Sequence, residues 1–517
     1  MRICIVGGGT AAACLVMALA RALGSRPVDL VIVEPSDQLW RGRAYRMDRD
    51  EIVVNAPPTM MTLNPNDPQH AQRWLARHHG ESCSSRWWTQ ESFPPRHVYG
   101  RYLEETLSQT LDGLAASGWR VEWLHRRAVS VALDGHKTLV GLEDGATVPC
   151  DYTVLCVGEP SEPFGYDPYE LAGHPSYISR PYPVASTLGT IHPSASVAVI
   201  GCGLTAVDTV LGLRAQSHQG RITLLSRDGI LAAVRRPRQV GRPSLLTPET
   251  VRDRLERSSS PLRLSTVAAL AREEALRAGA TPGQIASEMS MADWGLRRVR
   301  RQLTDREHVP NVDWLQVATW ALITTVHYWW PALPRSDRQQ FLRRYHRLWA
   351  SFTSPMPAAT ANTLVETADS GQLQVLRGLQ KITPAEQGFR ITAQHDTVEA
   401  DVVIAAATAP PAAHPATPDE LMDAVIRNGC GQQHPDGGLR VQPETGRLID
   451  RSGRPQPSLL ALGHLTSGTH YYLSGIPMLV WRSEAVAAAI AADASPSMAP
   501  PPPGLLTQVS PRRVKHP

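Results

Sequence analysis

The stretch Gly7-Gly8-Gly9-Thr10-Ala11-Ala12 decides the fold of this chain of 517 residues, because the same pattern returns as Gly201-Cys202-Gly203-Leu204-Thr205-Ala206. Each stretch follows a short apolar run, residues 3–6 or residues 197–200, and precedes an apolar helical pattern. In this context the first glycine permits a tight turn, the second lets backbone N–H groups approach a pyrophosphate, and the small sixth residue lets the helix pack on the strand. The two stretches predict an α/β fold with two Rossmann-like dinucleotide-binding domains.

The residue that ends the next apolar run indicates which dinucleotide each turn binds. After the first turn the run ends at Glu34, whose carboxylate can accept hydrogen bonds from ribose hydroxyls and would repel a 2′-phosphate. After the second turn it ends in Ser226 and Arg227, a hydroxyl and a guanidinium that can hold a 2′-phosphate. We therefore expect FAD or NAD at the first turn and NADPH at the second. The alternative is that Glu34 and Arg227 are merely charged residues at strand ends.

The segments after the two turns are also repeated, which favours a duplicated module over a coincidence of glycines. Each unit continues with a third apolar run, an alternating meander and a further apolar strand that reaches a loop. These segments are 121–124, 129–142 and 152–158 in the first unit, and 373–376, 382–393 and 402–408 in the second.

The composition narrows the class of protein. It is 42% hydrophobic and 19% charged, which is ordinary for a globular protein with a large core. A net charge of +4 gives no case for nucleic-acid binding. No run of about 18 apolar residues suggests a membrane span, and residue 1 leads directly into the first apolar run without a signal or transit peptide. We therefore expect a cytoplasmic protein.

The cysteines argue against two further classes of site. There are 7 of them, an odd number, with no C-x-x-C pair. Neither a disulfide framework nor a zinc cluster is indicated, so no metal site is predicted. Without a redox-active cysteine pair near the first turn, a disulfide-reductase reaction is not expected either.

Several motifs beyond the two turns are informative together. Gly42-Arg43-Ala44-Tyr45 is followed by Asn55 in an apolar, proline-containing context, and further matches lie at 94–102, 174–181 and 201–208. In these motifs the chain resembles the bacterial FAD–NAD(P)-binding proteins, which include flavin hydroxylases proposed to act on urate and N-hydroxylating monooxygenases. The resemblance covers most of residues 1–230 and returns near 459–489. It implies FAD at the first turn, with residues 42–60 passing the isoalloxazine.

The order of the patterns predicts an FAD-binding domain that is interrupted by an NADPH-binding domain, which in turn contains a helical insertion. The insertion is cationic and rich in tryptophan, and we expect its aromatic residues to pack inward and its arginines to be solvated. It is predicted to be a lid or to make substrate or oligomer contacts; RNA binding is the alternative. The expected segments are 1–160 and 410–493 for the FAD-binding domain, 161–234 and 370–409 for the NADPH-binding domain, 235–369 for the insertion, and 494–517 for a disordered proline-rich tail.

The C-terminal part departs from related proteins. Many two-dinucleotide flavoproteins bind the ribityl chain with an acidic residue, whereas residues 460–466 contain none, so we expect backbone contacts there. The last helix could point its N-terminal dipole at the flavin O2 and stabilise reduced flavin. The catalytic candidates near it are His464, His470, Tyr471 and Tyr472, each of which has a purely structural loop role as its alternative. The predicted cofactor-binding residues are Gly7, Gly9, Thr10, Ala12, Glu34, Arg43, Ala44, Tyr45, Asn55, Gly158, Gly201, Gly203, Leu204, Thr205, Ser226, Arg227 and Gly463.

FAD with NADPH, and no cysteine pair, favour a monooxygenase that hydroxylates nitrogen or carbon of a small molecule with O₂ through a flavin C4a-hydroperoxide. The expected partners are this small-molecule substrate and O₂, with no nucleic acid and no membrane, and a homo-oligomer is compatible with the sequence. Two alternatives stay open. One is a flavin dehydrogenase or oxidase without oxygen insertion, and the other is a non-catalytic FAD/NADP-binding redox protein.

Overall fold

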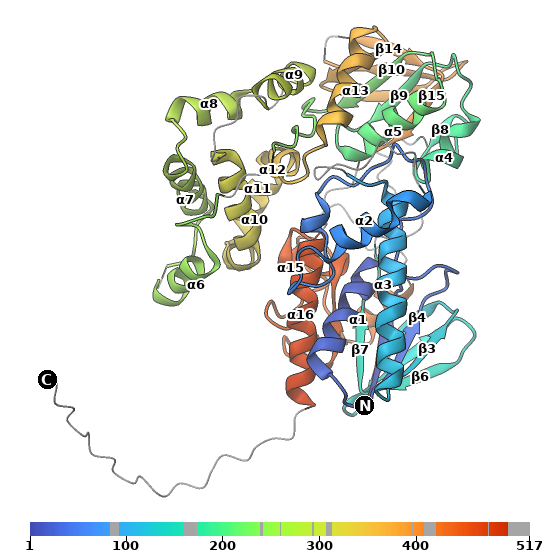
Figure 1. Cartoon of the computed structure of the whole chain (residues 1–517), viewed down its shortest axis with the longest axis vertical. Helices are drawn as coiled ribbons and strands as arrows, with labels where there is room; N and C mark the ends of the chain where they lie inside the picture. Colours follow the sequence, from blue (N-terminus) through green and yellow to red (C-terminus); the bar gives the residue numbers. More distant parts are fainter. Residues whose placement is uncertain are drawn as a thin grey trace, which may run out of the picture.

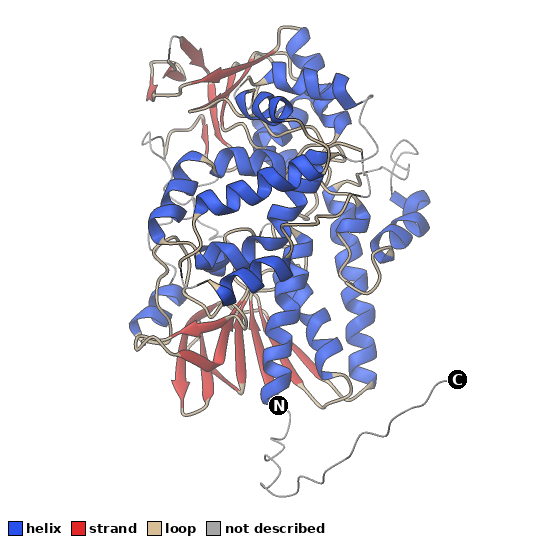
Figure 2. Cartoon of the chain, turned by 90° about the vertical axis from the view of Figure 1, so that its left-hand side faces the viewer, coloured by secondary structure: helices blue, strands red, loops and turns tan. Residues whose placement is uncertain are grey.

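Two mainly parallel β-sheets lie at opposite ends of the molecule, with helices between them (Figure 2). The computed structural model describes residues 1–82, 93–158, 171, 173–237, 241–258, 260–291, 294–306, 313–394, 396–407, 420–473 and 475–494. The predicted tail lies outside these residues apart from Ala494. Among the described residues no helix combines the length and the apolar character that a membrane span requires.

The first sheet has the strand order β16-β17-β7-β1-β2-β3 and is parallel except for β16. Alternate residues of a strand point to opposite faces, so Ile3 and Ile5 join one core while Cys4 and Val6 join another. Helices α1, α3 and α16 cover the first face, and an antiparallel sheet of β4, β5 and β6 lies on the second (Figure 1). The bounds are β1 (Arg2–Val6), β2 (Asp29–Val33), β3 (Arg120–Leu124), β4 (Ala128–Asp134), β5 (Lys137–Leu142), β6 (Thr147–Cys150), β7 (Tyr152–Leu155), β16 (Arg447–Ile449), β17 (Pro455–Ala461), α1 (Thr10–Leu23), α3 (Arg96–Ala116) and α16 (Ile476–Asp493).

The second sheet has the order β11-β10-β9-β15-β8 and is parallel throughout. Helices α5 and α13 pack on one face, and the antiparallel strands β12, β13 and β14 pack on the other. The bounds are β8 (Tyr177–Ile178), β9 (Val197–Ile200), β10 (Ile222–Ser226), β11 (Leu373–Arg377), β12 (Lys381–Pro384), β13 (Phe389–Thr392), β14 (Thr397–Ala400), β15 (Val402–Ala405), α5 (Leu204–Ala215) and α13 (Ala358–Asp369). This is the order of elements in the first unit, so the predicted α/β fold with a duplicated Rossmann-like module is confirmed.

Residues 235–369 separate β10 from β11 and form most of the helical mass at the left of Figure 1. Some of their aromatic side chains pack inward as expected, among them the buried Trp329, Trp330, Phe341 and Trp349. The expectation is wrong for Trp294, Trp320 and Tyr345, which are exposed. The expectation of solvated arginines is wrong for Arg298, which is buried because Glu288 supplies a counter-charge 3.5 Å away. The helices are α6 (Pro248–Arg257), α7 (Leu264–Arg277), α8 (Pro282–Ser290), α9 (Leu296–Asp305), α10 (Trp314–Ala332), α11 (Arg335–Arg344) and α12 (His346–Thr353), followed by α13.

A buried ion pair joins the two dinucleotide units. Arg96 at the start of α3 contacts Asp208 of α5 at 2.6 Å, and the hydroxyl of Tyr182 donates to the same carboxylate. Asp48 adds two hydrogen bonds of 2.8 Å from the backbone N–H groups that open α4. The turns are therefore held in a defined relation to each other.

The remaining helices are α2 (His70–Ser82), α4 (Val184–Thr187), α14 (Glu420–Arg427) and α15 (Ser467–His470).

Candidate active site

The two glycine turns have the same backbone geometry. Gly7 has φ +101° and Gly201 has φ +130°, a region that favours glycine. A Cβ atom at Gly7 would lie 2.8 Å from the carbonyl oxygen of Cys156, and one at Gly201 would lie 2.7 Å from that of Ala406. Each first glycine thus lets the turn pass against the end of the neighbouring strand, β7 or β15.

The helices that follow the turns begin without a side-chain cap. Gly9 is the N-cap of α1 and Gly203 is the N-cap of α5, and neither helix start receives a side-chain hydrogen bond. In the insertion Thr247 caps α6 and Asp313 caps α10, whereas α9 and α12 also begin without a side-chain cap. Uncapped N–H groups at a helix start are donors for an anion, and the macrodipole adds to the attraction. Both starts therefore fit the pyrophosphate of a dinucleotide.

Glu34 lies directly after β2, as predicted, and contacts the first turn. One carboxylate oxygen accepts a 2.8 Å hydrogen bond from the N–H of Gly8, and the other accepts one of 2.9 Å from the N–H of Ser36. Each carboxylate oxygen has a second lone pair. Glu34 is thus fixed beside the turn with acceptor capacity left for ribose hydroxyls.

Ser226 and Arg227 lie at the corresponding place in the second unit. The hydroxyl of Ser226 accepts a 2.8 Å hydrogen bond from the N–H of Gly229, which fixes this loop. The side chain of Arg227 is exposed, whereas the adjacent Asp228 is paired with Arg347 of α12. The insertion thus contacts the loop that follows β10, and binding of a 2′-phosphate by the exposed Arg227 stays a prediction.

We expect Arg227→Ala to reduce the preference for NADPH over NADH by roughly ten- to a hundred-fold, mainly through a higher KM for NADPH. A charge-assisted contact to a 2′-phosphate is lost, while NADH has no such phosphate. Steady-state NADPH and NADH oxidation by the wild type and the variant measures this ratio. Equal kinetics with both nucleotides in the wild type would contradict the assignment.

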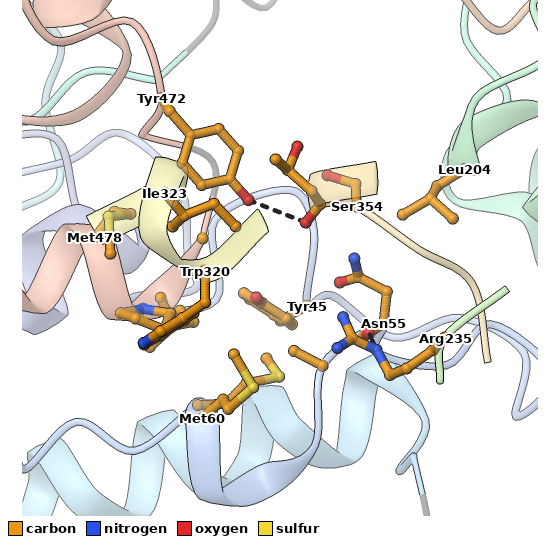
Figure 3. Close-up of a pocket in the computed structure, with 16 residues that line it drawn as sticks. Tyr45, Asn55, Met60, Leu204, Arg235, Trp320, Ile323, Ser354, Tyr472 and Met478 are labelled. Carbon is orange, nitrogen blue, oxygen red and sulfur yellow. Dashed lines mark hydrogen bonds between the residues drawn. The ribbon is translucent and has the colours of Figure 1, made fainter. Parts of the chain in front are cut away.

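A cavity of about 210 Å³ opens between the two units. Tyr45 and Asn55 come from the first unit, Leu204 is the first residue of α5, and Trp320 comes from the insertion (Figure 3). The N-terminus of α16 completes the wall, and its predicted orientation toward the flavin stays a prediction. The lining residues are Tyr45, Asn55, Ala56, Met60, Met61, Leu204, Arg235, Trp320, Ile323, Thr353, Ser354, Tyr472, Gly475, Ile476, Pro477 and Met478.

Arg235 is the charged residue of this wall that sequence reasoning missed. Its Nε donates a 2.6 Å hydrogen bond to the backbone oxygen of Asn55, which ties the insertion to the first unit. Burial lowers the pKa of Arg235 to about 10, so the guanidinium still carries its charge at neutral pH. The only sequence signal was the pair Arg235-Arg236 at the start of a basic segment, where nothing distinguished a cavity residue from a solvated one.

The other predicted cofactor residues surround the first turn and the cavity. Thr10 donates weakly to the carbonyl of Trp40, and the backbone at Gly42 passes 3.5 Å from the site of a Cβ at Gly9. Arg43 and Ala44 are exposed beside it, and Gly463 lies against Ala11 of α1. Their contacts to FAD stay predictions. The remaining members of the set are Ala12 in α1, Gly158 after β7 and Thr205 in α5.

Of the four catalytic candidates only Tyr472 lines the cavity, where its hydroxyl donates a 3.2 Å hydrogen bond to the backbone oxygen of Thr353 (Figure 3). Tyr471 is buried in the aromatic core of the insertion, with its hydroxyl 2.8 Å from Nδ1 of His346. His470 is 1% exposed and does not border the cavity. His464 lies in the 3-10 helix Gly463–Thr466, also away from the lining. The structure therefore does not bring the four candidates together.

The buried histidines behind the cavity wall have a measurable consequence. Burial, aided by the charge of Arg482, lowers the pKa of His327 to about 3 and that of His470 well below its usual value. Both are neutral in the fold but bind a proton in the unfolded chain below about pH 6.5, so stability present above that pH is lost as the pH falls. For each histidine, the free energy of unfolding falls by at most about 1.4 kcal/mol per pH unit.

We therefore expect the urea midpoint of the protein to fall between about pH 7 and pH 5 and to fall less steeply in His327→Gln. Urea titrations at both pH values test this, with a substitution of the exposed His136 by glutamine as control. A pH slope in His327→Gln equal to that of the wild type would contradict the assignment.

The comparison with protein families decides what the first unit is. Residues 4–160 match the model of a family described as FAD-NAD(P)-binding. This part of the chain is an FAD-NAD(P)-binding domain. The match agrees with the cofactors that the sequence predicts, FAD and NADPH. No curated protein matches the chain in sequence.

Solved structures share the whole fold around this FAD-NAD(P)-binding domain. The ornithine N-hydroxylase of Kutzneria sp. 744 has a TM-score of 0.55 at 14% identity, over 95% of this chain and 99% of that chain. The ornithine hydroxylase of Pseudomonas aeruginosa has a TM-score of 0.53 at 13% identity, over 96% and 99%. The FAD-bound cadaverine monooxygenase of Erwinia amylovora has a TM-score of 0.51 at 12% identity, over 99% of both chains. These likenesses establish the fold.

Proposed function

We propose that this protein is an FAD- and NADPH-dependent monooxygenase that hydroxylates nitrogen or carbon of a small molecule with O₂. The observation that carries the proposal is the composition of one cavity wall. Tyr45 and Asn55 of the FAD-NAD(P)-binding domain face Leu204, the first residue of the helix that follows the second turn. Two dinucleotides on the two turns would bring their reactive ends to this cavity. The neighbouring structures are those of hydroxylases and a monooxygenase, which supports the same reaction class.

Bound FAD would supply hydride acceptance from NADPH and activation of O₂. The protein would contribute charge and exclusion of water. The guanidinium of Arg235 and the uncapped N-terminus of α16 both present positive potential to the cavity. Ile323 and Met478 add apolar walls. Such an environment favours negative charge that develops within it and keeps water from a reactive intermediate.

The thiols beside the two turns support an oxygenase over a disulfide reductase. Cys156 and Cys202 are both buried, and neither forms a disulfide bond. Burial raises the pKa of Cys202 to about 11 and that of Cys156 further, so both stay protonated thiols at neutral pH. A thiol-exchange reaction needs a thiolate. Cys156, whose backbone contacts the first turn, and Cys202, which lies in the second turn, therefore lack a thiolate at neutral pH.

The proposed function is tested by measuring flavin reduction and O₂ uptake separately. Anaerobic addition of NADPH should bleach the flavin absorbance, and a metabolite screen in air should find a compound that stimulates both NADPH oxidation and O₂ uptake. A flavin oxidase or dehydrogenase would turn over its substrate without NADPH. A non-catalytic redox protein would show no compound-dependent O₂ uptake. Either result would replace the monooxygenase assignment.

We expect Arg235→Leu to slow NADPH-driven flavin reduction by about tenfold, a change of about 1.4 kcal/mol in the barrier, while FAD content stays normal. The substitution removes a half-buried positive charge from the cavity, where bound FAD would accept a hydride. Stopped-flow absorbance under anaerobic conditions measures the rate, and Arg235→Lys, which keeps the charge, should retain most of it. An unchanged rate in the leucine variant would remove Arg235 from the mechanism.

A further inference from the structure

An ion pair connects the helical insertion with the loop that follows β10. Arg347, in the first turn of α12, donates to the carboxylate of Asp228, which comes two residues after Ser226, the last residue of the strand. Both side chains are partly exposed, 34% for Arg347 and 47% for Asp228. An ion pair this exposed adds little to the stability of a fold, so its position beside the second dinucleotide unit calls for another explanation.

The loop that carries Asp228 has a defined shape. The hydroxyl of Ser226 accepts a hydrogen bond from the N–H of Gly229, and the backbone oxygen of Arg227 accepts one of 3.0 Å from the N–H of Gly378, which follows β11. Gly229 has φ +68°, a backbone conformation that glycine adopts without strain. Asp228 is therefore held next to Arg227, the residue that we expect to bind the 2′-phosphate of NADPH.

The helix that carries Arg347 is anchored as well. Trp349 packs in the aromatic core of the insertion, and the backbone oxygen of Ser351 accepts a 2.9 Å hydrogen bond from the N–H of Ala233. Burial raises the pKa of Cys202 in the second turn to about 11, and the positive charge of Arg347 acts against this rise. The guanidinium of Arg347 therefore lies close both to the second turn and to the loop after β10.

An acidic residue in this loop is unfavourable for NADPH. A carboxylate that follows the second strand of a Rossmann unit can accept hydrogen bonds from ribose hydroxyls and repels a 2′-phosphate, as expected for Glu34 in the first unit. An unpaired Asp228 would also compete with the phosphate for the guanidinium of Arg227. The ion pair with Arg347 cancels the charge of Asp228 and removes both effects.

We propose that Arg347 is a specificity-determining residue of the second dinucleotide site, because by neutralising Asp228 it lets Arg227 bind the 2′-phosphate of NADPH. Arg347 is a positioning residue that acts through Asp228 and not through a contact of its own with the phosphate. This role rests on the proposed NADPH-dependent function and extends it, since the helical insertion supplies a charge that the Rossmann unit itself lacks.

The test measures binding of NADP⁺ and NAD⁺ to the FAD-loaded protein by isothermal titration calorimetry, which requires no turnover. We expect the wild type to prefer NADP⁺. Arg347→Ala should lose about tenfold of this preference through weaker binding of NADP⁺, because one unneutralised charge beside a phosphate changes its affinity by about this factor. Arg347→Lys, which keeps the charge, should retain most of the preference. The matched control is Arg344→Ala, which removes a positive charge from the exposed end of α11 and should change nothing.

Asp228→Asn separates the proposed role from a direct contact with the phosphate. This variant should bind NADP⁺ at least as tightly as the wild type. In the Asp228→Asn background, Arg347→Ala should lower the preference by less than about twofold, because no carboxylate is left to neutralise. Normal flavin content and an unchanged thermal midpoint show that the variants are folded.

Two results would overturn the role of Arg347 alone. One is an unchanged preference for NADP⁺ in Arg347→Ala, and the other is a loss as large in the Asp228→Asn background as in the wild type. A wild type that binds NADP⁺ and NAD⁺ equally tightly would contradict the NADPH site of the proposed function, and the role of Arg347 with it.

Discussion

Gly9→Val is expected to yield a folded protein that no longer holds FAD. Gly9 has extended backbone angles, φ −84° and ψ −164°, which valine adopts without strain. A Cβ there would meet only Gly42, at an ordinary 3.5 Å. The side chain would instead occupy the approach of the pyrophosphate to the N–H groups of α1. Loss of two charge-assisted hydrogen bonds, each worth about 1.5–3 kcal/mol, lowers FAD affinity by roughly a hundredfold or more.

The flavin absorbance of purified protein measures this directly, with circular dichroism as the check on folding. The wild type should be yellow with about one FAD per chain. Gly7→Val would be a poor test, because Gly7 has φ +101° and touches the carbonyl of Cys156, so misfolding would explain any loss. Normal flavin content in Gly9→Val, or a wild type that cannot be reconstituted with FAD, would disprove the first site.

Gly203→Val is expected to abolish reduction by NADPH while FAD stays bound. Gly203 is exposed, has φ −81°, and a Cβ there would have no atom within 4 Å. The substitution therefore costs the fold little but blocks the start of α5, where the second pyrophosphate would bind. We expect the affinity for NADPH to fall by roughly a hundredfold or more, by the same loss of charge-assisted bonds.

Each of the two valine variants serves as the experimental control for the other. Gly9→Val should lose flavin, whereas Gly203→Val should be yellow, be bleached by dithionite and resist NADPH. Stopped-flow reduction over a range of NADPH concentrations gives the affinity. If Gly203→Val is reduced by NADPH as fast as the wild type at low NADPH, the second turn does not bind the nicotinamide dinucleotide.

The parts of the site predicted from sequence are those encoded by local pattern. A glycine that must pass a neighbouring strand and a strand that ends in Glu34 or Ser226 are short-range features, and the structure places each of them as expected. Tyr45 and Asn55 were found because their motif resembles that of known flavoproteins, and both line the cavity.

The features of the site that could not be predicted from the sequence depend on long-range packing. Tyr471 and Tyr472 are adjacent, yet Tyr471 has φ +60°, a backbone reversal that leaves its ring in the aromatic core while Tyr472 lines the cavity. No periodic pattern encodes such a reversal. Arg235 reaches the site only because the insertion folds back on the first unit, a long-range contact that no local pattern encodes.

The measurement that tests the central claim most directly is turnover under ¹⁸O₂, with mass spectrometry of the product from the first compound that stimulates NADPH oxidation. A monooxygenase takes one oxygen atom of its product from O₂, so the account predicts a hydroxylated product that carries one ¹⁸O atom. An unlabelled product, formed equally well without oxygen in the presence of an artificial electron acceptor, would contradict it and identify a dehydrogenase.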